Sequence, residues 1–188
     1  PRSQWEKFAS HKGFAFILGG VLPAGKKGIG RKVSQARMAL KLQNRARNLA
    51  ETFFWSIGVA PDWRNSGLCG RYGEWLGRRL LRSKGYRIIV SNWRSIGDRR
   101  QEIDMVCRKD EILVFVEVRA RSENALVRGF DSLGNRKMKS LRRSFKAYLR
   151  ETGVNTTHHR FDVIEVDLPS VKGNKPKVFH HENIAIFG

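Results

Sequence analysis

Residues 102–119 read EIDMVCRKDEILVFVEVR, and this stretch decides the fold. Apolar and β-branched residues dominate 103–107 and 112–118, and the polar residues 109–111 separate the two runs, as in a β-hairpin. The run 112–116 is apolar at every position, which is typical of a central strand covered on both faces. The stretch therefore predicts two neighbouring strands inside a sheet that carries helices on its faces.

The flanking sequence predicts further helices and strands. Tyr72, Leu76 and Leu80 recur at every fourth position, and Gly73 and Gly77 repeat that spacing, so this helix can pack closely against its neighbours. The expected elements are a helix over 70–84, strands over 86–90, 103–107 and 112–118, a loop over 121–135, a helix from 137 to near Gly153, strands over 161–166 and 176–179, and a terminal turn or helix over 182–187. This order predicts an α/β fold with a mixed sheet flanked by helices.

The composition points to a polyanionic partner. The chain has 188 residues, and its 37 Lys+Arg against 17 Asp+Glu give a net charge of +20. Such a charge favours nucleic acid first and an anionic membrane surface second. The length suits one domain with a substantial core plus an extension.

Three regions are expected along the chain. Residues 1–32 form a basic, flexible extension, 33–60 an amphipathic basic helix, and 68–188 the main domain. The helix either docks on a partner or is simply solvated. The longest apolar run, 14–22, is too short for the ~20 residues that span a bilayer, so no transmembrane segment is expected. Two cysteines without metal-site spacing favour a reducing, cytoplasmic setting.

Acidic residues on the two central strands predict a metal site. Alternate strand residues share a face, so Glu102 projects with Asp104, and Glu117 projects with Arg119. Carboxylates from neighbouring strands can bind Mg²⁺ or Mn²⁺, which prefer oxygen ligands. The alternatives are an internal ion pair, either Glu117–Arg119 or Asp104 with an arginine, and a solvated Glu102 that pairs with Arg99 or Arg100.

Six segments together resemble the bacterial YraN-type family. They are Gly73-Glu74, Asn92-Trp93-Arg94, Glu102-Ile103-Asp104, Phe115-Val116-Glu117-Val118-Arg119, Lys137 and Arg160-Phe161-Asp162-Val163. That family is predicted to adopt the restriction-endonuclease-like PD-(D/E)XK fold and is similar to archaeal Holliday junction resolvases. The resemblance covers about residues 68–188 and leaves residues 1–60 outside it.

The resemblance also implies roles for individual residues. Glu74 would be the first-helix acid, and Asp104, Glu117 and the Val118 backbone carbonyl would bind the metal ion, with Glu74 as a further candidate ligand. Glu102 would lie next to these ligands without binding the metal ion itself. Arg119 stands where the wider nuclease superfamily usually has lysine. Arginine can clamp a phosphate but is a poor proton shuttle, so water activation would depend on the metal.

Basic residues beyond the metal site are expected to contact nucleic acid. Lys137 opens the second predicted helix and either binds phosphate there or is a solvated lysine. Further backbone contacts are expected from Arg121, Arg142, Arg143, Lys146 and Arg150. The histidine pairs at 158–159 and 180–181 are expected at the surface, because adjacent histidines rarely chelate one metal ion.

These expectations define two main functions. The first is a Mg²⁺- or Mn²⁺-dependent endonuclease that acts on structured or branched DNA rather than RNA, in the nucleoid, as a homodimer by analogy with junction-cleaving enzymes. The second is a non-catalytic nucleic-acid-binding protein, associated with RNA or the ribosome, on a nuclease fold. A third function, membrane-surface attachment through residues 1–57, follows from the basic N-terminal region alone.

Overall fold

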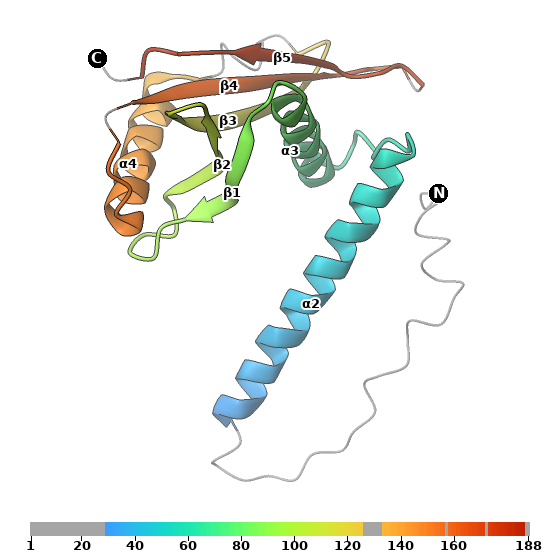
Figure 1. The fold of residues 1–188 in the computed structure, drawn as a ribbon. Coiled ribbons are helices and arrows are strands. Elements are labelled where there is room, and N and C mark those ends of the chain that lie inside the picture. The colour runs from blue at the N-terminus through green and yellow to red at the C-terminus, as the bar shows by residue number, and fades with distance from the viewer. Residues whose placement is uncertain (1–28, 126–132, 157, 172, 187–188) are drawn as a thin grey trace. The chain divides into compact units, whose positions relative to one another are not determined.

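The chain divides into two units, Pro1–Asp62 and Trp63–Gly188. The structure, a computed structural model, describes residues 29–125, 133–156, 158–171 and 173–186 (Figure 1). At the start of the first helix, only residues 38, 39 and those from 42 onward have described side chains. The predicted extension up to residue 28, with its apolar run 14–22, lies outside the described residues.

The first unit contains helix α2, Ile29–Ser56. The helix begins before the predicted residue 33, inside the segment expected to be flexible, because Arg31 and Lys32 are themselves good helix formers. It ends before the predicted residue 60, and Gly58 follows with φ of 89°. None of the described helices combines the length and the apolar character needed to cross a bilayer.

The second unit is built on a five-stranded mixed sheet in the order β1-β2-β3-β4-β5. Its elements are α3 (Ser66–Ser83), β1 (Arg87–Arg94), β2 (Glu102–Lys109), β3 (Ile112–Ser122), α4 (Asn135–Thr152), β4 (His159–Leu168) and β5 (Lys177–His181). Only the β3–β4 pair is parallel. The predicted α/β fold with a mixed sheet and flanking helices is confirmed (Figure 1).

The two helices of this unit cover opposite faces of β3. A Cβ added to Gly73 of α3 would lie 2.9 Å from the Cβ of Ala120, so α3 approaches the sheet too closely for a side chain there. On α4, the ring of Phe145 stacks on Phe115 with 4.3 Å between centroids. Ala120 and Phe115 are separated by an odd number of strand positions, so their side chains point to opposite faces. The result is a helix–sheet–helix arrangement.

Several element boundaries differ from the predicted ones. Helix α3 begins at Ser66 instead of residue 70, because the side chain of Asn65 accepts a hydrogen bond from Leu68 N at 3.0 Å and caps the helix. Strand β3 continues to Ser122, into the predicted loop, because β4 provides parallel pairing up to Leu168. The middle of that loop, 126–132, lies outside the described residues. No helix forms over residues 182–186.

Candidate functional site

The site lies where strands β2 and β3 part. Their pairing ends at Met105↔Val116. Beyond this point β2 pairs only with β1, and β3 continues beside β4. The carboxylate of Asp104 accepts a hydrogen bond from Val118 N at 2.7 Å. The side chain thus satisfies a β3 amide that has lost its strand partner, and it is held in the fork between the two strands.

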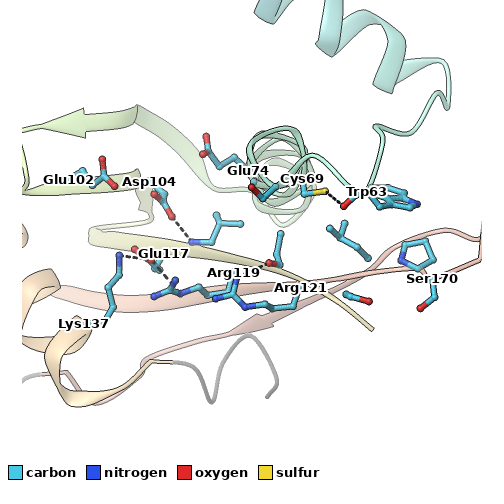
Figure 2. A pocket seen from close by; sticks show the side chains of 17 residues that line it. Trp63, Cys69, Glu74, Glu102, Asp104, Glu117, Arg119, Arg121, Lys137 and Ser170 are labelled. Carbon is cyan, nitrogen blue, oxygen red and sulfur yellow. Dashed lines mark hydrogen bonds and ion pairs between the residues drawn. The ribbon is translucent and has the colours of Figure 1, made fainter. Parts of the chain in front are cut away.

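Asp104 and Glu117 form a close pair of acids at this fork (Figure 2). Glu117 is 4% exposed. Burial, reinforced by the negative charge of Glu117, raises the pKa of Asp104 to about 7. The Val118 hydrogen bond and the charge of Lys137 oppose this shift without cancelling it. Such a displaced pKa in a cavity is typical of functional sites.

Glu74 reaches the same cavity from helix α3. Asn92 Nδ2 donates to Glu74 Oε2 at 3.1 Å, and Arg78 Nη1 lies 3.9 Å from the same oxygen. Burial raises the pKa of Glu74, and these two partners counteract it in part. The side chain of Glu74 also contributes to the raised pKa of Asp104, so the three predicted acids belong to one electrostatic cluster.

Asn92 is a site residue that the sequence analysis quoted but did not assign. It has φ of 54° within strand β1, a conformation that asparagine tolerates better than most residues. Asn92 lies beyond the predicted strand 86–90, and only the longer observed strand β1 includes it. Its role, the fixing of Glu74, requires the packing of α3 beside β1 and was not visible in the sequence.

Two cations hold Glu117. Lys137 Nζ lies 2.7 Å and Arg119 Nε 3.4 Å from Glu117 Oε1. The internal Glu117–Arg119 ion pair left open as an alternative is therefore present. Lys137 is engaged with an acid rather than freely solvated. The Nε of Arg119 is buried and makes no hydrogen bond within the described part of the chain, so its contact with Glu117 is purely ionic.

Glu102 occupies the rim of the site. Arg94 Nη2 lies 2.8 Å from Glu102 Oε2, and the side chain of Glu102 is 47% exposed. The expected partner Arg100 instead pairs with Asp98 at 3.0 Å. The hairpin register explains the difference, because Glu102 lies directly opposite Arg94 in the β1–β2 ladder.

A cavity of about 560 Å³ connects these residues (Figure 2). The acids, Arg119 and Lys137 line one part of it, and Trp63 and Ser170 line another. Exposed Arg121 also lines the cavity. Its size is within the range of small-molecule and nucleotide sites, roughly 300–1,000 Å³.

The remaining predicted nucleic-acid contacts separate into two groups. Arg143 and Lys146 are exposed on α4, as is Arg150. Arg142 is different, because its Nε donates to the carbonyl of Ile186 and ties α4 to the C-terminal segment. Arg142 therefore has a structural contact that the sequence did not indicate.

The donor atoms suit a hard cation. Asp104 and Glu117 offer carboxylate oxygens, which Mg²⁺ and Mn²⁺ prefer, and Mg²⁺ commonly takes only one or two carboxylates and keeps several waters. Within the described residues, no group of three or more His, Cys, Asp or Glu side chains could hold a metal ion. A metal here would therefore depend on the Asp104–Glu117 pair, the backbone and water.

A second polar cluster surrounds Asp162, which is fully buried. Its carboxylate contacts Arg160 Nε at 3.0 Å, His180 Nε2 at 2.9 Å and Asn183 N at 2.9 Å. The expectation that His180 lies at the surface is wrong, since its side chain is 1% exposed. Pairing of β5 with β4 turns this histidine onto Asp162.

The comparisons with known proteins agree on one family. Residues 73–166, half of the 188-residue chain, match the "Uncharacterised protein family UPF0102". The UPF0102 protein of Carboxydothermus hydrogenoformans is 33% identical over 118 residues, 63% of this chain and 95% of the relative. The UPF0102 protein of Alkaliphilus oremlandii is 37% identical over 116 residues, which cover 61% of this chain and 94% of the relative. The UPF0102 protein of Pelotomaculum thermopropionicum is 39% identical over 116 residues, which cover 62% of this chain and 93% of the relative.

The second unit thus defines an α/β protein with an acid-lined fork in a mixed sheet. The chain belongs to the UPF0102 family. The matched residues include Glu74, Asp104, Glu117, Arg119 and Lys137.

Proposed function

We propose that this protein is a metal-dependent endonuclease that hydrolyses phosphodiester bonds of structured or branched DNA. The observation that carries the proposal is the Asp104–Glu117 pair, two acids forced together at a strand fork within a chain of net charge +20. Like charges at close range are costly unless a cation or proton neutralises them. The resemblance to the YraN-type family and its PD-(D/E)XK fold also supports this function.

Each residue of the site then has a role. Asp104, Glu117 and the Val118 carbonyl would hold Mg²⁺ or Mn²⁺, and Glu74 lines the same cavity. When bound there, Mg²⁺ or Mn²⁺ would supply a water of lowered pKa and positive charge beside the attacked phosphate. Lys137 and Arg119 already lie against Glu117, so they can exchange part of this contact for a phosphate oxygen.

The proposal is tested with a panel of duplex, flap, four-way-junction and single-stranded substrates in Mg²⁺ or Mn²⁺. We expect cleavage by the wild-type chain and a loss of roughly 100-fold or more in Asp104→Asn, which keeps the shape of the side chain. Glu102→Gln is the matched control, because it changes a neighbouring acid that pairs with Arg94. Unchanged cleavage by Asp104→Asn would overturn the assignment.

A second candidate function is binding of nucleic acid without cleavage. The observation that favours it is that Lys137 and Arg119 already neutralise Glu117. Calorimetric titration with Mn²⁺ separates the two functions. Mn²⁺ binding that disappears in Asp104→Asn supports the nuclease, and absence of binding by the wild-type chain supports the binding protein.

Location and assembly follow as parts of the same proposal. A DNA substrate implies a place in the cytoplasm at the nucleoid, and the buried thiols of Cys69 and Cys107 are compatible with a reducing setting. Cleavage of a two-fold symmetric junction favours a homodimer. Sedimentation with and without a four-way junction tests this, with a dimer as the expected bound species.

A further inference from the structure

Five basic residues form a stripe along the outer face of helix α4. They recur at spacings of three and four and are Arg136, Lys139, Arg143, Lys146 and Arg150. All five are exposed. Because residues three and four apart share a helix face, the five cations lie in one row, which we call the α4 stripe.

The α4 stripe has one acidic neighbour on its own helix, Glu151, whose pKa the charge of Arg150 helps to lower. No ion pair joins a stripe residue to an acid in the part of the chain that the structure describes. The only acid on α4 is Glu151, and its carboxylate is occupied by Ser95 Oγ and Ile96 N. Like charges at this spacing repel one another along a helix, so binding of an external polyanion would reduce the repulsion within the stripe.

The shape of the α4 stripe suits an extended polyanion rather than a compact one. Fourteen helical steps separate Arg136 from Arg150, which corresponds to about 21 Å at ~1.5 Å per residue. One DNA strand carries a phosphate about every 3.4 Å along the helix axis, so a stripe of this length follows several successive phosphates. A single phosphate or short acidic peptide would engage only part of it.

A membrane surface fits this helix less well. Interfacial helices insert an apolar face between lipid headgroups. The apolar face of α4 is already buried against the sheet through Leu141, Phe145 and Tyr148. The stripe therefore offers charge without an apolar face for insertion.

The stripe begins beside the candidate site. Arg136 precedes Lys137, whose Nζ contacts Glu117 at 2.7 Å. A backbone that follows α4 is thereby led toward the cavity at its first turn. Arg142, which the sequence analysis grouped with these cations, lies outside the stripe because it contacts Ile186.

We propose that the α4 stripe is a sequence-independent binding surface for the phosphate backbone of duplex DNA, which it leads to the cavity. The inference rests on the proposed function only in taking nucleic acid as the substrate. Exposed arginine and lysine side chains in a row contact phosphates and leave base edges unread.

The test is fluorescence anisotropy with a labelled 30-bp duplex in EDTA at several salt concentrations. The stripe variant combines Lys139→Gln, Arg143→Gln and Lys146→Gln. The control combines Arg82→Gln, Arg87→Gln and Lys175→Gln, which remove the same charge from exposed positions on α3, β1 and the β4–β5 connection. Thermal unfolding verifies that both variants fold.

We expect the stripe variant to lose tenfold or more in affinity and the slope of log K against log[salt] to decrease by about 2–3, since each phosphate contact contributes about 0.9. The control keeps the wild-type slope to within about one contact. Equal slopes in the two variants would overturn the inference, as would binding to anionic vesicles in preference to DNA.

The outcome is distinguishable from failure of the nuclease proposal. The assay contains no metal, so it measures binding separately from cleavage. If the stripe variant has a reduced slope and the wild-type chain cleaves no substrate, the stripe proposal stands and the nuclease proposal fails. If the wild-type chain cleaves DNA and the stripe variant keeps the wild-type slope, the nuclease proposal stands and the stripe proposal fails.

Discussion

Asp104 and Asp162 lie on β2 and β4, the two strands that flank β3, and their surroundings are opposite. Asp162 receives hydrogen bonds from Arg160, His180 and a backbone amide. Burial alone would raise its pKa, but these donors outweigh burial and the pKa is lowered. Asp104 receives one backbone hydrogen bond and faces Glu117, and its pKa rises to about 7.

On the proposed function, the difference separates a structural acid from an acid of the metal site. A carboxylate surrounded by donors stabilises the fold as an anion and has little capacity left for a ligand. The negative charge of a carboxylate that faces another acid in a cavity is not fully balanced by its neighbours, and a metal ion or a proton can balance it. The family resemblance includes both Asp104 and Asp162, so surroundings rather than residue type distinguish their roles.

The largest expected effect is on stability at Asp162. Asp162→Ala leaves Arg160 and His180 without their buried partner and should lower the free energy of unfolding by about 3–5 kcal/mol. Urea denaturation measures this change. Asp98→Ala breaks a solvent-screened pair with Arg100 and should lower the free energy of unfolding far less. A loss at Asp162 as small as that at Asp98 would contradict the structural role.

The next effect is on the pH dependence of stability, and its sign differs at the two aspartates. The folded pKa of Asp104, about 7, exceeds its ordinary 3.8, so the folded state binds more protons between these values and loses stability as pH rises through this window. The slope is at most about 1.4 kcal/mol per pH unit. The lowered pKa of Asp162 adds stability above its ordinary pKa of 3.8, and this is lost as pH falls through the folded value.

This difference is measured as the free energy of unfolding in EDTA at pH values from about 4 to about 8, a range that contains these pKa values. Asp104→Asn should remove the decline and become more stable than the wild type near pH 8. Glu102→Gln should follow the wild-type curve. Parallel curves for wild type and Asp104→Asn would mean that Asp104 is not the strained acid of the pair.

A smaller effect concerns the close packing of α3 on the sheet, which positions Glu74 near Asp104. Gly73→Ala forces a Cβ to 2.9 Å from Ala120 and should cost about 1–3 kcal/mol. Gly70→Ala meets nothing within 4 Å and should instead stabilise the helix by about 0.5–1 kcal/mol. Equal and favourable effects at both glycines in thermal denaturation would show that α3 need not pack so closely.

The smallest effect is expected at Glu102. Glu102→Gln removes a half-exposed pair with Arg94 and should change stability by less than about 1 kcal/mol. Its Mn²⁺ affinity should remain within about threefold of wild type, because the side chain lies at the rim. A loss comparable to that of Asp104→Asn in the same titration would move Glu102 among the metal ligands.

The strands and helices around the site could be predicted because their signals are local. The apolar run 112–116 predicted a covered central strand. The expected pairing of the two neighbouring strands brought Asp104 and Glu117 together. Boundaries were less accurate, because they depend on partners. Ser122 is in a strand only because β4 lies beside it.

The sequence by itself determined the mixed α/β fold, the basic charge and the acids that lie together, since periodicity and charge are properties of neighbouring residues. Only the tertiary structure decided which acids are neutralised. The fork between β2 and β3, the contact of Asn92 with Glu74 and the burial of His180 against Asp162 all join residues far apart in the chain. Such contacts depend on register and helix packing, which residue type alone does not specify.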